Sequence, residues 1–284
     1  MVSVTVVIPT KNAGERFETT LERIRQQTVE SVEVVVVDSG SSDGTVALAE
    51  ALADEVIEID PDEFHHGRTR NRGARAATGD VVVFTVQDAI PAGDEWLERL
   101  VGPIADGDAD LTYGNQIAHH GAKPPDRFFY QYFYPDEPVT LDRSDTADKA
   151  AFYLDNVFLS DVNCAVAADV WEEFRFRDSV SMSEDKDFAY RVAAAGNTIR
   201  YCPDAAVYHS HDYDLRSLFA RRYRDGRAFD EVAGGDSGEF VTDGVGYVLS
   251  EYRYLVRSGT SYWIPYAVLY DLIHFVAFMI GKHR

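Results

Sequence analysis

Four consecutive valines, Val34 to Val37, constrain the fold of this chain more than any other feature. Consecutive β-branched residues predict a strand buried on both faces, as in a parallel sheet covered by helices. The run ends at Asp38, and small turn-forming residues follow it, with Asp43 as the expected N-cap of a helix that begins at Thr45. Asp38 therefore lies at the carboxyl end of a strand, where open α/β sheets bind ligands. The alternative is an ordinary strand–helix turn capped by the aspartate.

Strands and helices alternate through the first half of the chain, which predicts a doubly wound α/β sheet. We expect strands near 3–9, 32–38, 55–59, 81–86 and 110–115, and helices near 15–27, 44–53, 68–77 and 94–101. The segment 118–150, rich in proline and aromatic residues, predicts an irregular insertion over a site. Further strands are expected near 162–169 and 198–208, a helix from Ser183 to Ala195, and mostly helix from Leu215 onward.

Two strand ends occur in a characteristic order. The first strand ends in Pro9, Thr10, Lys11 and Asn12, and the second ends in Asp38, with glycines and serines after it. In this combination the chain resembles family 2 glycosyltransferases of the GT-A fold, in which these loops hold the nucleotide of a sugar donor. The resemblance implies that Pro9, Thr10, Asn12 and Asp38 bind the nucleotide.

The same resemblance implies the domain organisation. We expect a GT-A domain with a doubly wound mixed sheet over residues 1–214, followed by a helical C-terminal extension over 215–284. Within the GT-A domain, 1–115 is the expected nucleotide-sugar-binding half and 116–214 the acceptor-binding half.

The expected metal site departs from the family pattern. GT-A enzymes carry an Asp-x-Asp motif after the fourth strand, whereas here Gln87 precedes a single acid, Asp88. One carboxylate can hold a hard divalent ion if the donor phosphates and a second protein ligand complete the shell. By resemblance His209 is that ligand, with His211 as its substitute, and Gln87 and Asp88 face the donor. We therefore expect Mn²⁺ or Mg²⁺; the alternative is that the histidines are structural.

A basic segment, residues 64–73, opens the helix before that strand. Basic residues in a first helical turn oppose the helix dipole, which favours a functional role over a merely solvated helix face. A phosphate bound at the helix N-terminus beside Arg68 or Arg70 would explain them. The segment resembles the rhamnosyltransferase-like branch of family 2, which implies a deoxysugar donor such as dTDP-rhamnose.

The expected catalytic base lies in a second acidic motif. Glu184 and Asp185 follow Ser183, the predicted N-cap, so both fall in a first helical turn, where the dipole stabilises carboxylates. Acids are also common there without a catalytic role. By resemblance Asp185 is the general base for the acceptor hydroxyl and Glu184 binds acceptor hydroxyls. One base without a second nucleophilic carboxylate implies direct displacement with inversion.

Acceptor binding is the least specific expectation. Asn163, Trp171 and the aromatic run 128–134 are candidates, although such aromatic residues more often belong to a core. The Gln-x-x-Arg-Trp motif of processive polysaccharide synthases is absent from the sequence, so we expect one sugar to be added per encounter.

Charge and cysteine content limit the kinds of partner and the cellular compartment that we expect for this protein. The net charge is −21, with 48 acids against 27 bases, so a nucleic-acid partner is not expected. Aspartate-rich, lysine-poor composition is typical of proteins from a high-salt cytoplasm, and the alternative is an ordinary acidic protein. Cys164 and Cys202 lack metal-ligand spacing and no signal-peptide pattern precedes the first strand, which fits a reduced cytoplasm.

The last predicted helix, from Tyr262 to Gly281, is strongly apolar and about the length of a membrane span, but Pro265, Asp271 and His274 interrupt it. Segment 251–284 carries four Lys or Arg residues against two acids, so a peripheral contact with an anionic membrane is expected. A dimer interface or a helix packed on the core are the alternatives.

The sequence therefore predicts a metal-dependent inverting glycosyltransferase that acts at the cytoplasmic membrane face on a lipid-linked or surface-glycan acceptor. A nucleotidyltransferase is a rival with a similar sheet, but the loop that begins at Lys11 is too short for its glycine-rich motif. A degenerate, non-catalytic sugar-binding or assembly subunit is the other rival, because the second metal-motif acid is missing.

Overall fold

A computed structural model describes the backbone of residues 2–232 and 238–283, and the side chains of 2–231 and 244–283. The chain divides into two compact units. The first contains residues 1–116, 136–147 and 158–209, and the second contains 117–135, 148–157 and 210–284. Two segments from within the predicted GT-A domain thus cluster with the C-terminal helices, and the predicted boundary at residue 214 stays a prediction.

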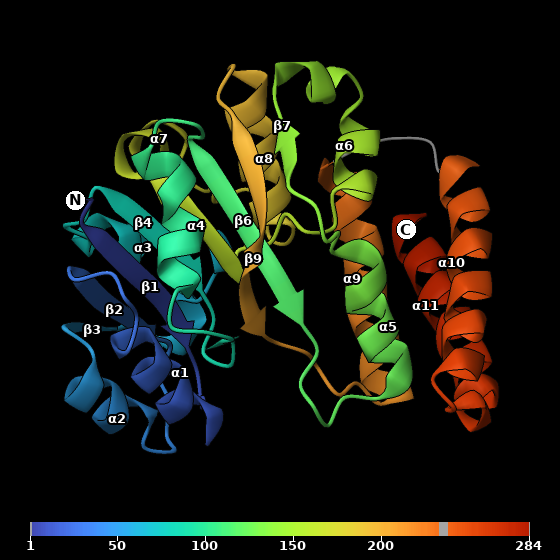
Figure 1. The fold of residues 1–284 in the computed structure, drawn as a ribbon. Coiled ribbons are helices and arrows are strands. Elements are labelled where there is room, and N and C mark those ends of the chain that lie inside the picture. The colour runs from blue at the N-terminus through green and yellow to red at the C-terminus, as the bar shows by residue number, and fades with distance from the viewer. Residues whose placement is uncertain (1, 233–237, 284) are drawn as a thin grey trace. The chain divides into compact units, whose positions relative to one another are not determined.

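The first unit is built on a mixed sheet (Figure 1). Its parallel half has β1 (Val4–Thr10) between β2 (Val32–Asp38) and β4 (Val81–Thr85), with β3 (Glu55–Glu58) beyond β2. Beyond β4 follow β8 (Asn163–Ala167), β6 (Leu111–Ile117), β9 (Ile199–Tyr208) and β5 (Ile90–Pro91), and β7 (Val139–Leu141) also pairs with β9. Strand β8 runs antiparallel to β4 and β6, which confirms the predicted mixed sheet.

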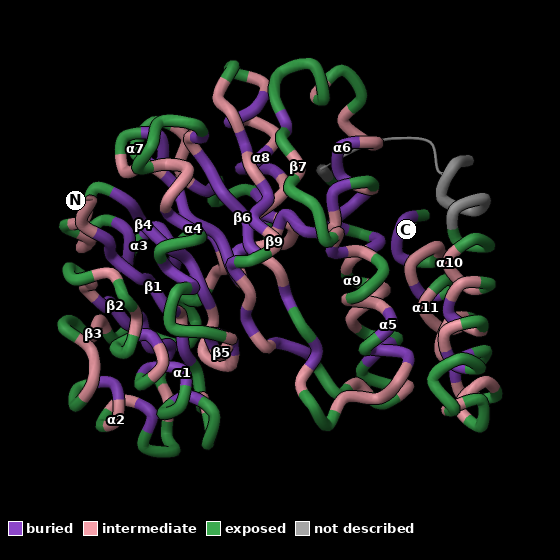
Figure 2. Tube along the Cα trace, in the orientation of Figure 1, coloured by how far each residue is buried: buried purple, intermediate pink, exposed green. Residues whose placement is uncertain are grey.

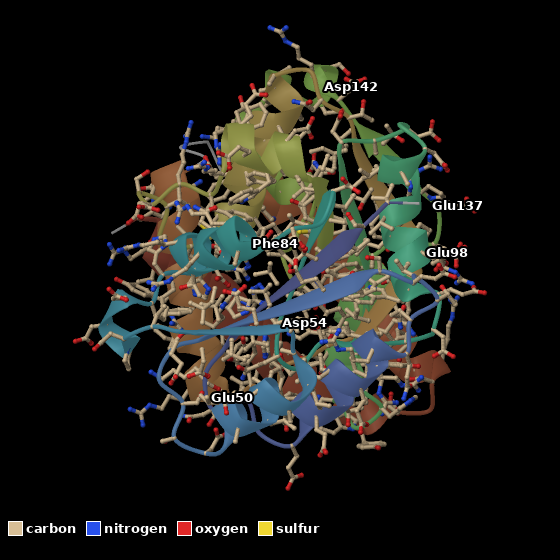
Figure 3. All side chains as sticks on the ribbon, turned by 90° about the vertical axis from the view of Figure 1, so that its left-hand side faces the viewer. Glu50, Asp54, Phe84, Glu98, Glu137 and Asp142 are labelled. Carbon is tan, nitrogen blue, oxygen red and sulfur yellow. The ribbon has the colours of Figure 1, made fainter. Side chains whose placement is uncertain are left out.

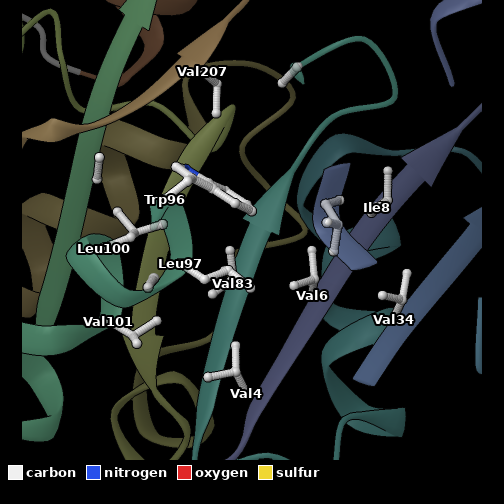
Figure 4. Close-up of a cluster of buried hydrophobic side chains, with 14 of the residues drawn as sticks. Val4, Val6, Ile8, Val34, Val83, Trp96, Leu97, Leu100, Val101 and Val207 are labelled. Atoms are coloured by element: carbon white, nitrogen blue, oxygen red, sulfur yellow. The ribbon is translucent and has the colours of Figure 1, made fainter. Parts of the chain in front are cut away.

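Helices cover both faces of this sheet because alternate strand residues are apolar on each side. On one face, valines of β1, β2 and β4 pack against α1 (Arg16–Arg25), α2 (Thr45–Leu52) and α4 (Trp96–Ala105), and Figure 4 shows Trp96 and Leu97 over Val83. Gly44, at φ 92°, is the N-cap of α2, and Asp43 instead accepts a bond from the backbone N–H of Thr45, which corrects the predicted cap.

The opposite face carries α3 (His66–Ala76), α7 (Ala168–Phe174) and α8 (Glu184–Ala194). Phe84 of β4 packs edge-on against Phe176, which in turn contacts Phe188 of α8. Helix α3 lies very close to the sheet at Gly73, where a Cβ atom would be 2.4 Å from Cγ1 of Val7. This contact fixes the height of α3 above β1, and with it the position of the side chains at the start of α3.

The surface of the first unit is rich in solvated carboxylates. Glu50, Asp54, Glu98, Glu137 and Asp142 are all exposed, and Figure 3 shows Glu137, Glu98 and Asp142 toward the edge of the view. Both cysteines of the chain are buried and free.

The second unit is helical and contains α5 (Pro124–Phe133), α6 (Lys149–Asp155), α9 (Leu215–Val232), α10 (Gly238–Arg257) and α11 (Ile264–Lys282). The prediction of an irregular segment over 118–150 was wrong, because that segment contains α5, β7 and the start of α6. Pro124 and Pro125 occupy the first turn of α5, where a missing N–H costs nothing, and Phe128 packs on Tyr247 and Tyr254 of α10.

Candidate active site

The predicted nucleotide residues converge at the carboxyl edge of the parallel strands. Thr10 and Asp38 are register partners, and the Thr10 hydroxyl donates to Oδ2 of Asp38 at 3.0 Å. The backbone N–H and the hydroxyl of Ser41 donate to the same carboxylate at 2.7 and 2.6 Å. Asp38 is completely buried, so its carboxylate is engaged within the turn, and direct contact with a nucleotide stays a prediction.

Side chains connect the loops after β1, β2 and β4. The Asn12 amide oxygen accepts the backbone N–H of Ser42 at 2.9 Å, and Asn12 itself has a positive φ of 45°. The Gln87 amide oxygen accepts the backbone N–H of Lys11 at 2.8 Å, while Pro9 is partly buried at the end of β1. These bonds hold the three loops in one arrangement at the sheet edge, where a donor would bind.

Asp88 and His209 face each other near that edge. Their Oδ1 and Nε2 atoms lie 3.8 Å apart, brought together because β5 pairs with β9 next to His209. His209 is almost fully buried, and its Nδ1 lies 2.9 Å from the amide oxygen of Gln116. An Nδ1–H donated to that oxygen leaves the Nε2 lone pair directed at Asp88, which is the orientation a metal-ligating histidine needs. The donor set therefore fits a hard divalent ion. His211 follows two residues later, in the second unit, and is exposed.

Glu184 and Asp185 begin α8, as predicted, after Ser183 in a left-handed conformation with φ 64°. Burial raises the pKa of Asp185 to about 6, the negative charge of Glu184 adds to this, and Lys186 and Arg70 oppose it. Asp185 is still partly exposed to solvent. A partly exposed carboxylate with a pKa near 6 is ionised at neutral pH and can still accept a proton, which suits a general base.

Arg70 forms a buried ion pair with Glu184. Its Nη1 lies 2.7 Å from Glu184 Oε1, and its Nε lies 3.5 Å from Oδ2 of Asp161. Arg70 is buried, so its charge is directed at these two carboxylates, and the predicted phosphate contact would compete with them. Arg68, in contrast, is exposed in the first turn of α3, and its backbone N–H donates to His65 Nδ1. Their predicted roles toward the donor phosphates are untested.

Asp161 is a part of the site that the sequence did not reveal. Its side chain is almost fully buried, and burial raises the pKa of its carboxyl well above the usual range, although Arg70 opposes this. The Cys164 thiol lies 3.5 Å from the other oxygen of this carboxylate. The only sequence signal is an acid immediately before a buried strand, which alone has no specific meaning.

Asn163 and Trp171, which were predicted with Glu184 to bind the acceptor, are buried. Asn163 donates to the carbonyls of Asn115 and Ala205 at 2.9 and 2.8 Å and accepts from the Trp96 indole, so every polar atom of its amide is engaged. Trp171 is also buried, and its indole N–H donates to Asn71. Their positions indicate packing roles, and their predicted contact with an acceptor stays a prediction.

Solved structures resemble this chain over almost its whole length, and one of them is a mannosyltransferase. A mannosyltransferase from Pyrobaculum calidifontis, PcManGT, in complex with GDP-Man and Mn²⁺, matches with a TM-score of 0.64 and 19% identity over 99% of this chain and 87% of that one. Residues 1–349 of S. aureus TarS in complex with UDP match with a TM-score of 0.59 and 15% identity over 99% of this chain and 90% of that one. At these identities the likeness establishes the fold alone, and the fold is GT-A.

The chain belongs to glycosyl transferase family 2. The model of that family matches residues 5–169, and the model of glycosyl transferase family group 2 matches 144–281. The O-antigen chain rhamnosyltransferase RfbN of Salmonella typhimurium is 33% identical over 99% of this chain and 90% of that protein. The O-antigen chain rhamnosyltransferase WbaN of Salmonella anatum is 32% identical over 100% of this chain and 90% of that protein. The chain is therefore a glycosyltransferase, which removes the non-catalytic and nucleotidyltransferase rivals.

Proposed function

We propose that this enzyme transfers one sugar from a nucleotide-sugar donor to a lipid-linked or surface-glycan acceptor, with inversion at the anomeric carbon. The observation that carries the proposal is Asp185, a partly exposed carboxylate at the start of α8 whose pKa is raised to about 6. In its ionised form it accepts the proton of the acceptor hydroxyl as that oxygen attacks the anomeric carbon. The bond from this carbon to the leaving diphosphate breaks in the same displacement.

The different surroundings of the two neighbouring carboxylates support inversion. Glu184 is bound by Arg70 at 2.7 Å and buried, so it is poorly placed to attack a sugar carbon. Retention by a covalent route needs a free carboxylate nucleophile close to the acid–base group. With Glu184 engaged, the site supports a single displacement with Asp185 as base, and we assign Glu184 to binding acceptor hydroxyls at the edge of its ion pair.

We assign Asp88 and His209 as the protein ligands of a divalent ion, Mn²⁺ or Mg²⁺, with His211 as a substitute ligand. Bound there, the ion neutralises charge on the leaving nucleoside diphosphate. The assignment is supported by the facing Oδ1 and Nε2 atoms, 3.8 Å apart, and by Gln116, which orients the imidazole. The presence of Mn²⁺ with the similarly folded mannosyltransferase is consistent with it.

The donor and the location are proposed from the relatives and the composition. Two relatives at 33% and 32% identity are named as O-antigen chain rhamnosyltransferases, which supports dTDP-rhamnose or another nucleoside diphosphohexose as donor. A glycan acceptor carried on lipid agrees with a cytoplasmic enzyme that works at the inner face of the membrane. The aspartate-rich surface agrees with a high-salt cytoplasm.

A panel of nucleotide sugars tests the proposal. Purified protein is incubated with each donor and a lipid-linked glycan acceptor, in high salt, with Mn²⁺, Mg²⁺ or chelator, and both nucleoside diphosphate release and glycosylated product are measured. We expect one donor to be used, only with metal, and the new linkage to have inverted anomeric configuration by NMR. Asp185→Asn should abolish turnover while donor affinity is kept, and Asp178→Asn, at an exposed acid, is the matched control. A retained configuration would contradict the mechanism.

A further inference from the structure

Helices α10 and α11 each expose a long apolar stripe. On α10 the stripe contains Val245, Leu249 and Val256, at spacings of four and seven residues that place them on one helix face. On α11 it contains Val268, Leu269, Leu272, Phe275, Val276 and Ile280, with Leu272 56% exposed. Figure 2 shows both helices drawn mainly in the colours of exposed and intermediate residues. Large apolar side chains exposed in stripes of this length are typical of a surface that binds a partner or a membrane.

The described charged side chains of these two helices, from residue 244 onward, are sorted by sign. Among the side chains described from 244 to 283, the only acids are Glu251 and Asp271. Glu251 is completely buried; burial, with Asp271 next to it, raises its pKa to about 9, and burial also raises the pKa of Asp271. Arg253 and Arg257, in contrast, are exposed and continue the α10 stripe, four and eight residues after Leu249. Over its described side chains this surface is thus apolar and positive, in a chain of net charge −21.

Helix α11 is suited to lie in the plane of a membrane surface rather than to cross the membrane. Residues 261–282 are long and apolar enough to cross a membrane by length and composition, and only 28% of the apolar window is buried. However, α11 is packed backbone to backbone on α9: a Cβ atom at Gly281 would lie 2.1 Å from the Tyr223 carbonyl oxygen. Helix α9 carries Arg221, Arg222 and Asp225 in ion pairs, and drawing these charges into a bilayer is costly.

We propose that the α10–α11 surface binds in the plane of an anionic phospholipid membrane, with its apolar stripes at the level of the acyl chains and Arg253 and Arg257 on the headgroups. Tyr262 and Trp263, in the short 3-10 helix Ser261–Trp263 just before α11, are aromatic residues of the kind that favours such an interface. The acidic remainder of the chain is repelled by the same lipids, which orients this surface toward them. A second copy of the chain is less favoured, because it would bring another charge of −21 close by.

Vesicle flotation of the full-length protein tests this surface. The probes are vesicles of phosphatidylcholine alone and of phosphatidylcholine with phosphatidylglycerol in equal parts, at low and at high salt. We expect flotation with the anionic vesicles, reduced at least about tenfold by Val256→Glu or Leu272→Glu, because each puts a charge where apolar surface is buried. Arg253→Gln and Arg257→Gln should each weaken binding to the anionic vesicles about fivefold. Ile117→Glu, at an exposed apolar position outside both helices, is the control and should float like the wild type.

The inference deepens the proposed peripheral location and is independent of the sugar transferred. Donor hydrolysis without lipid is measured on every variant, so a loss of flotation with hydrolysis intact concerns the surface alone. Absence of flotation with both vesicle types overturns the inference. If light scattering then gives a dimer that Leu272→Glu dissociates, a second copy occupies the surface instead. Flotation that is the same in Val256→Glu, Leu272→Glu and wild type also overturns it.

Discussion

The pH dependence of turnover should report on Asp185, and Glu184→Gln is the change that tests the reasoning. Burial and the neighbouring Glu184 charge raise the pKa of Asp185 to about 6 from an ordinary value of 3.8. A general base acts only when it is ionised, so activity should be lost as the pH falls through 6. Removing the Glu184 charge lowers the pKa of Asp185, because the like charge that disfavours ionisation is gone while burial remains.

The size of the effect follows from the pKa. With a value of about 6, about nine-tenths of Asp185 is ionised at pH 7 and about one-tenth at pH 5, so wild-type kcat/KM should fall about tenfold between them. In Glu184→Gln the fall of kcat/KM on the acidic side of the pH–rate profile moves to lower pH. The variant therefore keeps a larger fraction of its own pH 7 rate at pH 5. Loss of acceptor hydrogen bonds lowers the absolute rate of this variant but leaves the shape of the profile informative.

The assay is the initial rate of nucleoside diphosphate release at subsaturating donor and acceptor, from pH 4.5 to 8, on wild type and Glu184→Gln. Asp178→Asn, at an exposed acid, should keep the wild-type pH–rate profile. If activity of Glu184→Gln falls at the same acidic pH as that of the wild type, Glu184 does not act on the base electrostatically. A wild-type profile that is flat between pH 5 and 7 would refute the assignment of Asp185.

Three other features of the structure give measurable expectations. Arg70→Met leaves two buried carboxylates without a counter-charge and should lower the free energy of unfolding in urea by about 3–5 kcal/mol, whereas Arg72→Met, which removes an exposed ion pair, should cost at most about 1 kcal/mol. If both variants lose the same free energy of unfolding, the buried ion pairs of Arg70 contribute no more to stability than the exposed pair of Arg72. Glu251 has a folded pKa of about 9 against 4.5 when unfolded, so its burial costs stability increasingly as the pH rises from 4.5 to 9. Glu251→Gln should therefore raise Tm at pH 8 more than at pH 5, and a lower Tm at pH 8 would contradict this. Gln116→Leu removes the bond that orients His209 and should weaken Mn²⁺ binding about 10- to 100-fold by calorimetry. Unchanged affinity would exclude His209 as an oriented ligand.

The parts of the fold that local pattern controls were predictable. The valine runs of β2 and β4 identify buried strands wherever they lie, and each predicted strand of the first unit is present. The convergence of Thr10 with Asp38 follows from the register of parallel neighbours. The pairing of Asp88 with His209 was expected from a family resemblance, and the structure brings the two side chains together.

The parts that depend on distant partners were not predictable. Helix α5 is stabilised by Phe128 packing on α10, more than a hundred residues later, which no local window contains. The role of Asp161 exists only because α3 and α8 bring Arg70 and Glu184 to it. Burial of Trp171 likewise depends on the tertiary contact with Asn71, which its local sequence does not reveal.

The most direct test of the central claim is metal-dependent transfer from a nucleotide sugar by wild type and Asp185→Asn, measured side by side with donor binding. The account predicts that wild type releases one nucleoside diphosphate and forms an inverted linkage, and that Asp185→Asn binds the same donor but does not turn it over. Turnover by Asp185→Asn at the wild-type rate would contradict the account.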